Sequence, residues 1–472
     1  MRPLGAGGGA QGPWQDCSHL ENSPFHILSR LFLLPSVTPR PRGRPDPAGM
    51  VNLFSSLQNE SVPTLALFAA ILSAAIWLYL AIARGSFFHL RPFDDDLARH
   101  TPPPTWPSVT AIVPARNEGA TIGQSIASLL QQDYPGEFGI ILVDDHSEDT
   151  TAKLAEQAAT QQNAAARVAI HHAAPLPQNW TGKLWALNEG VTLSFASSSQ
   201  NVSSRGERGI CFSEPSSSQL PAPTYFWFTD ADITHAPDTL TRLVSRAEQN
   251  HLDLTSLMVW LQAKTIPEQA TIPAFLFFFL KLYPPKWIAN AEAGTAGAAG
   301  GCILLRRAAL ARIGGFSAIR SEVIDDCALA RAVKNTGGKI WMGLTRASIS
   351  LRAYNSFAEV RDMVARTAFT QLRYSALLLL GTIVGLILTY LAPIALLFAH
   401  NNVTRTIALL TWLTMSLLFL PTIRFYRLLP HWAPLLPLTA ALYAYATFLS
   451  AIRYYANRGA QWKGRSQVPQ SK

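Results

Sequence analysis

Charged residues are scarce in this chain. Only 15% of its 472 residues are Asp, Glu, Lys or Arg, whereas 49% are hydrophobic. A composition this apolar excludes a purely soluble protein and assigns part of the chain to a membrane. The net charge of +9 fits basic clusters beside membrane spans better than nucleic acid binding, so we expect a membrane and no nucleic acid among the partners.

Cysteine is scarce too. The four cysteines are Cys17, Cys211, Cys302 and Cys327, and none of them forms a Cys-x-x-Cys pair. This spacing argues against a zinc module and against a disulfide scaffold. The sequence also lacks a Gly-x-Ser-x-Gly motif and a Cys/His pairing, which argues against acyl transfer.

Long apolar runs, by contrast, are present. They lie near residues 62–82, 376–399, 406–423 and 433–452. The first has the length of a transmembrane helix, and the others make a membrane region, 376–452, of about three helices. Arg84 and Arg91 follow the first run, and the positive-inside rule places them in the cytoplasm. We therefore expect a multi-pass protein of the inner or cell membrane with a cytoplasmic central block.

The two ends of the chain complicate this topology. Residues 1–49 are rich in Gly, Pro and Arg and lack any period, so we expect a disordered extension. Its arginines precede the first span, against the charge rule, which favours Met50 as the true start. Residues 453–472 form a basic tail that prefers the cytoplasm, yet three C-terminal spans would place it outside. Either one run is re-entrant or the charge rule fails here.

The central block, residues 108–375, has the patterns of an α/β fold. A β-branched strand at 109–113, a helical period at 121–132 and a buried strand at 138–143 form a strand-helix-strand unit. Such units build a parallel sheet that binds ligands at the carboxyl ends of its strands.

Two segments of the block depart from this pattern. Residues 194–223 are Ser-rich and bounded by proline, which predicts a disordered surface insertion. Residues 272–288 combine a Phe-rich run with Lys281 and two prolines, which is too broken to span. We interpret them as an interfacial segment that guides a lipid toward the site, with a buried core helix as the alternative.

The stretch at 225–235, YFWFTDADITH, is the centre of the block. It behaves as a buried strand that ends in Asp230 and Asp232. On an extended segment these two side chains share a face, so both can bind one divalent cation, Mg²⁺ or Mn²⁺. The alternative is a solvated turn or a helix cap.

Polar residues at the other strand ends indicate a nucleotide. Asp145 follows the strand at 138–143 and is suited to bind a base or ribose, with Arg116 and Glu118 on the neighbouring loop. Alternatively, the acidic loop only caps the following helix. Lys183 precedes a helical stretch, where a cation can offset the charge of a diphosphate.

The order of these motifs is informative. They are Val113-Pro114-Ala115-Arg116-Asn117-Glu118, Val143-Asp144-Asp145, Gly182-Lys183 with Asn188, Asp230-Ala231-Asp232, Gly300-Gly301 to Arg306, Gly314-Gly315-Phe316 and Asp325-Asp326. The set resembles family 2 inverting glycosyltransferases of the GT-A fold. With the flanking spans it is most similar to the hopene-associated glycosyltransferase group, relatives of ceramide glucosyltransferase and carotenoid glycosyltransferases. The resemblance implies an α/β GT-A catalytic domain with flanking transmembrane helices.

The resemblance also implies roles for particular residues. The implied donor-binding set is Arg116, Glu118, Asp145, Lys183, Asp230 and Arg373, with Asp230 and Asp232 on the metal. Asp326 matches the general base that takes the proton of the acceptor hydroxyl. The family commonly has Glu-Asp where this chain has Asp325-Asp326, so Asp325 or Glu322 fills the acceptor-side role. The alternative for this acidic pair is a helix N-terminus, where anions are favourable.

Three further residues belong to the acceptor side. Gly300 and Gly301 would let an acceptor approach the backbone closely, with a tightly packed turn as the alternative. Membrane-bound relatives often have Arg-Trp before their C-terminal spans. Here Arg373 matches that arginine and would bind the diphosphate, while Tyr374 replaces the tryptophan and would stack on the acceptor.

We therefore expect an inverting hexosyltransferase that moves a sugar from a nucleotide-diphosphate sugar to a membrane lipid, in hopanoid or related glycolipid biosynthesis. Inversion needs one in-line displacement with one base and no enzymic nucleophile. Polyprenyl-phosphate sugar transfer or polysaccharide synthesis is the alternative among enzymes. From another class, the chain could be a membrane transporter or an inactive scaffold.

Overall fold

The computed structural model describes residues 47–95, 101–203, 223–456, 458, 461–462 and 465–466. The chain divides into two units, Met1–Ser61 and Val62–Lys472. The described part of the first unit is the start of helix α2 (Pro47–Ile82). The predicted disordered extension therefore lies outside the described residues up to residue 46, and so does most of the basic tail.

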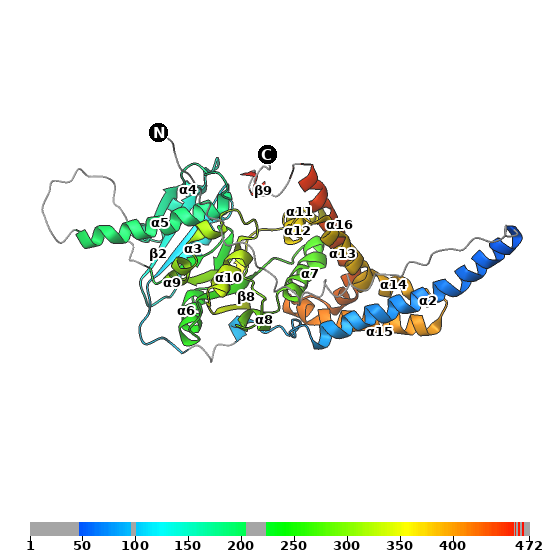
Figure 1. Ribbon diagram of the computed structural model, residues 1–472. Coiled ribbons are helices and arrows are strands. Elements are labelled where there is room, and N and C mark those ends of the chain that lie inside the picture. Colours follow the sequence, from blue (N-terminus) through cyan, green and yellow to red (C-terminus); the bar gives the residue numbers. More distant parts are fainter. Residues whose placement is uncertain are drawn as a thin grey trace, which may run out of the picture. The chain divides into compact units, whose positions relative to one another are not determined.

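In the second unit the described residues form an eight-stranded mixed sheet, in the order β3-β2-β1-β4-β7-β6-β8-β5 (Figure 1). The strands are β1 (Val109–Ala115), β2 (Phe138–Asp144), β3 (Val168–His172), β4 (Tyr225–Phe228), β5 (Ile233–His235), β6 (Leu254–Trp260), β7 (Ile303–Arg306) and β8 (Ile340–Ser350). Strands β1 to β4 are parallel neighbours, which confirms the predicted parallel unit. Strand β7 is antiparallel to both β4 and β6.

Helices cover both faces of the sheet. They are α3 (Ile122–Leu130), α4 (Thr151–Gln161), α5 (Gly182–Ser203), α6 (Thr239–Gln249), α7 (Ile266–Leu282), α8 (Pro285–Ala289), α9 (Arg307–Arg312), α10 (Asp325–Asn335), α11 (Phe357–Ala365) and α12 (Ala368–Gln371). Because side chains alternate along a strand, Ala111 and Val113 belong to one core with Ile126 of α3. Ile112, between them, belongs to the other core with Leu187 of α5. The block is thus a three-layer α/β structure.

Helix α5 corrects one boundary of the predicted insertion. The helix continues to Ser203, so residues 194–203 are helical rather than irregular. The buried side of α5 extends to the start of this stretch. Ser194 is fully buried there, and its hydroxyl donates to the carbonyl of Val191. Residues 204–222 of the predicted insertion lie outside the described part of the chain.

Four helices of the described residues are long and apolar enough to cross a membrane. These stretches are Pro63–Ile82, Ala376–Leu396, Asn402–Phe425 and Pro430–Tyr455. They confirm the four predicted runs as candidate spans by length and composition. They comprise the C-terminal part of α2, then α13 (Ala376–Leu386), the π-helical turn η5 (Ile387–Leu391) and α14 (Ala392–Leu396), then α15 (Asn402–Phe425), and finally η6 (Pro430–Leu435) and α16 (Leu436–Tyr455).

Helix α7 connects the α/β block to these apolar helices. Phe277 is fully buried, stacks with Trp77 of α2 and makes an edge-to-face contact with Phe419 of α15. One core therefore includes residues of the sheet and residues of the membrane helices, such as Ile112 and Met415. The segment predicted to be interfacial, 272–288, consists of the mostly buried α7 followed by α8. This agrees with the alternative of a buried core helix. The position of the segment relative to lipid stays a prediction.

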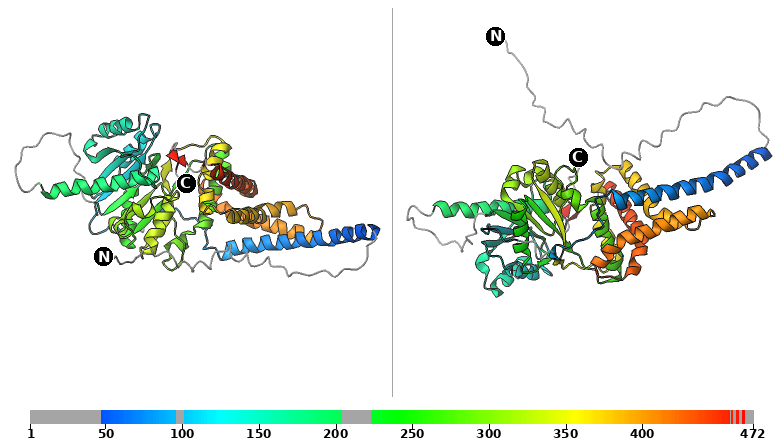
Figure 2. Two further views of the ribbon diagram at one scale, coloured as in Figure 1. Left: turned by 45° about the horizontal axis from the view of Figure 1, so that its top comes forward. Right: turned by 90° about the horizontal axis from the view of Figure 1, so that it is seen from below.

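Helices α15 and α16 take different courses. The carbonyl of Phe425, at the end of α15, accepts from the guanidinium of Arg346 on β8, and Figure 2 shows the rest of α15 extending away from the sheet. Helix α16 instead contacts the block near both ends. Thr439 donates to the carbonyl of Ala270 on α7 at 2.8 Å, and Ser450 accepts from the backbone N–H of Phe369 at 3.1 Å.

Candidate active site

Three loops with polar residues meet at the carboxyl edge of β2, β1 and β4. The pairing places Ala115 of β1 beside Asp144 of β2, and Ile112 of β1 beside Phe228 of β4. The loops that follow these strands carry Arg116, Asp145 and Asp230 respectively. The sheet therefore brings the predicted donor-side residues to one edge, where open α/β sheets bind their ligands.

Arg116 holds the loop that carries Asp145. Its guanidinium donates to the backbone carbonyl of Asp145 at 2.5 Å and to that of His146 at 3.1 Å. The Asp145 side chain is fully buried, with Oδ1 3.3 Å from Nδ1 of His146. The neighbouring acid Asp149 accepts from the backbone N–H of Thr151, so the capping alternative applies to Asp149. Contact of Arg116 and Asp145 with a donor stays a prediction.

The sequence predicted that Asp230 and Asp232 lie on an extended segment. In the structure neither residue lies on a strand. Strand β4 ends at Phe228, and both residues occupy the turn before β5. A buried network holds this turn, because the Thr229 hydroxyl donates to the carbonyl of Gly301 at 3.0 Å and lies 2.8 Å from Nε2 of His235. The turn keeps the two carboxylates close to each other without extended geometry.

Lys183 lies at the centre of the acidic residues. Its Nζ is 2.8 Å from Oδ1 of Asp230 and 3.4 Å from Oδ2 of Asp325. Burial alone would lower the pKa of Lys183, but the charges of Asp230 and Asp325 raise it above its ordinary value. Burial would likewise raise the pKa of Asp230, but Lys183 holds it below its usual range. The lysine is therefore charged and links the loop after β4 to the start of α10.

Asp232 pairs with an arginine that the sequence motifs missed. Nε of Arg352, two residues after β8, lies 3.6 Å from Oδ2 of Asp232, and its guanidinium lies 4.0 Å from Oε1 of Glu118. Burial and then the negative charge of Asp230 raise the pKa of Asp232 to about 6. The carboxylates of Asp230 and Asp232 are thus close enough to repel each other and to favour a shared cation.

Asp326 is buried at the start of α10. Its Oδ2 accepts from the backbone N–H of Gly300 at 2.9 Å, and its Oδ1 accepts from the N–H of Cys327 at 2.7 Å. Burial, and then the charge of Asp325, raise the pKa of Asp326 to about 6. Both acids lie in the first turn of α10, so the helix-terminus alternative describes their position correctly. Near neutral pH a carboxylate with this pKa is suited to accept a proton.

The two predicted glycines have different surroundings. A Cβ on Gly300 would lie 3.2 Å from Nζ of Lys183 and 3.4 Å from Oδ2 of Asp326, so Gly300 leaves space within the site. A Cβ on Gly301 would lie 3.2 Å from both γ carbons of Val259, which fits the packing alternative. A cavity of about 10 Å³ is lined by Lys183, Asp230, Asp326 and other residues of this centre.

Arg373 and Tyr374 make no described side-chain contact with the acidic residues of this centre, and their expected roles stay predictions. The Arg373 side chain is exposed and makes no hydrogen bond or ion pair with another described residue. Tyr374 stacks on Tyr454 of α16, with ring centroids 4.4 Å apart. The left-handed backbone at both residues turns the chain between α12 and α13. Arg366, the C-cap residue of α11, lowers the pKa of Asp230 by its positive charge.

The metal-binding prediction has a specific structural basis. Within the described residues, no group of three or more His, Cys, Asp or Glu side chains is arranged to hold a metal ion. Asp230 and Asp232 supply two hard carboxylates instead. Magnesium is often held by one or two carboxylates while substrate phosphates and waters complete its shell, so the pair fits such an ion.

These observations define the class of protein. A mixed sheet whose parallel half ends in acidic loops, with a buried aspartate near a lysine, fits a GT-A glycosyltransferase that uses a nucleotide sugar. The family models agree. Residues 223–468, just over half of the chain, match glycosyl transferase family 21, and residues 110–196 match glycosyl transferase family 2. The chain belongs to glycosyl transferase family 21.

Comparison with solved structures gives similar folds at low identity. A mannosyltransferase of Pyrobaculum calidifontis, solved with GDP-Man and Mn²⁺, is 17% identical, covers 83% of this chain and 99% of its own, and has a TM-score of 0.49. S. aureus TarS 1–349 with UDP-GlcNAc is 13% identical over 76% and 95% of the two chains, with a TM-score of 0.32. Glucosyl-3-phosphoglycerate synthase of Mycobacterium tuberculosis is 16% identical over 57% and 79%, with a TM-score of 0.32. No curated protein matches the chain.

Proposed function

We propose that the protein transfers a sugar, with inversion, from a nucleotide-diphosphate sugar to a hydroxyl of a membrane lipid, in hopanoid or related glycolipid synthesis. The observation that carries this proposal is the convergence of Lys183, Asp230, Asp325 and Asp326 at one edge of the sheet. This edge adjoins the apolar helices through the shared core, so a lipid acceptor and a soluble donor can reach the same place.

The chemistry follows from two sides of this centre. On the acceptor side, Asp326 takes the proton of the hydroxyl as its oxygen bonds to the anomeric carbon. On the donor side, the bond from that carbon to the phosphate oxygen breaks, and the nucleoside diphosphate leaves with the electron pair. Lys183 and Arg352 supply positive charge beside the leaving group. One displacement on one face of the sugar inverts the anomeric configuration.

Asp230 and Asp232 would hold a divalent cation, Mg²⁺ or Mn²⁺. A bound cation supplies neutralisation of the charge that develops on the departing diphosphate. The raised pKa of Asp232, which arises from burial and from Asp230, supports this assignment because a cation would relieve the repulsion between the two acids. Asp145 would bind the base of the nucleotide, with Arg116 keeping its loop in place.

A direct test is to incubate membranes that contain the protein with a panel of labelled nucleotide sugars and to extract the lipid fraction. We expect one sugar to enter lipid, and its product to have the opposite anomeric configuration to the donor. A labelled polyprenyl phosphate, or label in polymer, would instead support the alternatives. Transport of unmodified sugar nucleotide would contradict the proposal; the transporter alternative has no support in the family matches.

The pH profile tests the base. Because the pKa of Asp326 is raised to about 6, the base is protonated and inactive below that pH, and kcat/KM should rise through about pH 6. An ordinary aspartate would already be ionised near pH 4. Since Asp325 contributes to the raised pKa, Asp325→Asn should move the acid limb to lower pH. Profiles of both proteins from pH 4.5 to 8 decide this, and a flat wild-type profile down to pH 5 would exclude Asp326 as the titrating group.

The course of α16 supports a particular topology. Thr439 and Arg453 both contact the α/β block, the latter through Asp362 at 2.6 Å. Fourteen residues of helix separate them, about 21 Å, which is shorter than the hydrocarbon core of roughly 30 Å. We infer that α16 lies along the cytoplasmic membrane face and is the one apolar run that does not cross the membrane. The basic tail then shares the side of the catalytic block, in agreement with the positive-inside rule.

Cysteine labelling tests this topology. In a protein with Cys17→Ser and Cys211→Ser, single cysteines are introduced at Gln461, at Glu156 on α4 and at His400 before α15. An impermeant maleimide added to sealed vesicles of known orientation should label Gln461→Cys and Glu156→Cys from one side, and His400→Cys from the other. Labelling of Gln461→Cys together with His400→Cys would show that α16 spans.

A further inference from the structure

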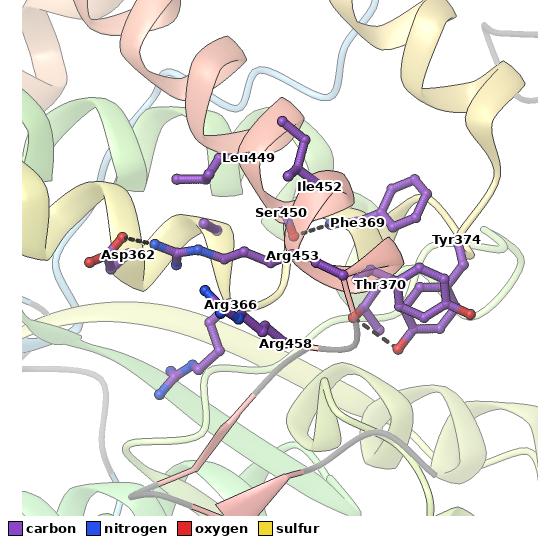
Figure 3. A pocket seen from close by; sticks show the side chains of 13 residues that line it. Asp362, Arg366, Phe369, Thr370, Tyr374, Leu449, Ser450, Ile452, Arg453 and Arg458 are labelled. Atoms are coloured by element: carbon purple, nitrogen blue, oxygen red, sulfur yellow. Dashed lines mark hydrogen bonds and ion pairs between the residues drawn. The ribbon is translucent and has the colours of Figure 1, made fainter. Parts of the chain in front are cut away.

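A second cavity lies where α11 and α12 meet the end of α16, and it shares no lining residue with the cavity beside Lys183. It has a volume of about 660 Å³, which is within the range of small-molecule sites. Its walls include Arg366, Phe369, Tyr374, Leu449, Arg453 and Arg458. Figure 3 shows the arginines toward one end and Phe369 and Tyr374 toward the other. The cavity is therefore cationic at one end and apolar at the other.

The positive charge of this cavity exceeds its negative charge. Arg453 pairs with Asp362 at 2.6 Å, and Asp362 is shared with Arg361 at 3.0 Å. Asp362 is the one acidic residue among the lining residues, against three arginines. The guanidinium groups of Arg366 and Arg458 make no hydrogen bond or ion pair within the described part of the chain. Their donors match the oxygens of a phosphate group.

The surroundings of the cavity are those of a membrane surface. Helix α13, one of the four apolar candidate spans, begins at Ala376, two residues after Tyr374. Leu449 and Ile452 of α16 line the wall above the arginines (Figure 3). Aromatic residues such as Tyr374 and Tyr454 are also typical of the boundary between headgroups and hydrocarbon. A soluble anion would use the arginines but not this apolar wall.

We propose that this cavity binds the phosphate-bearing headgroup of an anionic membrane lipid, with the acyl chains directed along α16. The phosphate oxygens accept from Arg366 and Arg458, and Arg453 stays paired with Asp362. None of the residues that line this cavity lines the cavity beside Lys183, so the proposal does not depend on the proposed sugar transfer.

Native mass spectrometry of the purified full-length protein tests this site with three probes. These are phosphatidylglycerol, phosphatidylcholine and glycerol 3-phosphate, the last being the headgroup chemistry without acyl chains. We expect phosphatidylglycerol to bind best. The double variant Arg366→Gln/Arg458→Gln should weaken it by about twenty-five-fold, from roughly fivefold for each arginine. Phosphatidylcholine binding should be unaffected by the variant, and glycerol 3-phosphate should not compete.

The matched control is Arg331→Gln, which removes the same charge from an exposed position on α10 outside the cavity. It should bind phosphatidylglycerol like the wild type, and Arg366→Lys/Arg458→Lys should recover part of the affinity. Thermal unfolding of each variant shows whether the fold is intact. Equal phosphatidylglycerol affinity in wild type and the folded double glutamine variant would overturn the site. Equal affinity for glycerol 3-phosphate would overturn the assignment to a lipid.

Discussion

Asp326→Asn is expected to lower turnover by roughly a hundred- to ten-thousandfold, the usual effect of losing a general base. The asparagine side chain has nearly the same shape, and its oxygen can still accept from the N–H of Gly300 or Cys327. Donor binding should therefore change little, because the proton transfer is lost and the nucleotide-side residues remain. Turnover and donor affinity by calorimetry, measured on the same purified protein, separate these effects.

Two control variants make this result specific. Asp145→Asn should do the reverse, because a base-reading carboxylate contributes to ground-state binding; we expect donor affinity to fall by roughly ten- to a hundredfold. Asp325→Asn should be milder than Asp326→Asn, since Asp325 pairs with Lys183 at 3.4 Å and does not accept from Gly300. If Asp325→Asn is inactive and Asp326→Asn is active, the base has been assigned to the wrong acid.

The sequence predicted the features that local patterns determine. Apolar, β-branched and aromatic runs predicted strands β1, β2 and β4. The polar residues directly after each run marked where the strand ends and which acids lie there. The four candidate spans follow from length and hydropathy. Extrapolation past a strand end was less successful. Asp230 and Asp232 were expected on an extended segment, but the Thr229 and His235 contacts close the chain into a turn.

Contacts between distant segments could not be derived from the sequence. Arg352 reaches Asp232 because β8 pairs with β5 in a fixed register, and Ile233 lies beside Ser350. Nothing in the local sequence around Arg352 indicates this pairing. Arg373 and Tyr374 were favoured by their position before a span, but the sequence did not predict that Tyr374 stacks on Tyr454 of α16. Similarly, hydropathy shows that α16 is apolar, but it does not show that α16 contacts the α/β block at Thr439 and Ser450.

The second large effect concerns the divalent cation. We expect excess chelator to abolish sugar transfer and added Mn²⁺ or Mg²⁺ to restore it, because carboxylates and phosphate oxygens are the hard ligands that these cations prefer. A competing possibility is built into the site. Lys183 lies 2.8 Å from Asp230, and Arg352 lies 3.6 Å from Asp232, so two protein cations already neutralise the pair.

Binding of the nucleoside diphosphate separates these two possibilities without relying on turnover. If the pair holds a cation, Mn²⁺ should tighten nucleoside diphosphate binding to the wild type by at least tenfold, and this gain should largely disappear in Asp232→Asn. Asp133→Asn, which changes an exposed acid outside the site, should retain the full gain. Calorimetry with and without Mn²⁺ on the three proteins measures it. The metal-binding prediction is wrong if turnover is undiminished in excess chelator and nucleoside diphosphate binds equally with and without Mn²⁺. In that case the leaving diphosphate requires no metal ion, and Lys183 and Arg352 alone balance the charges of Asp230 and Asp232.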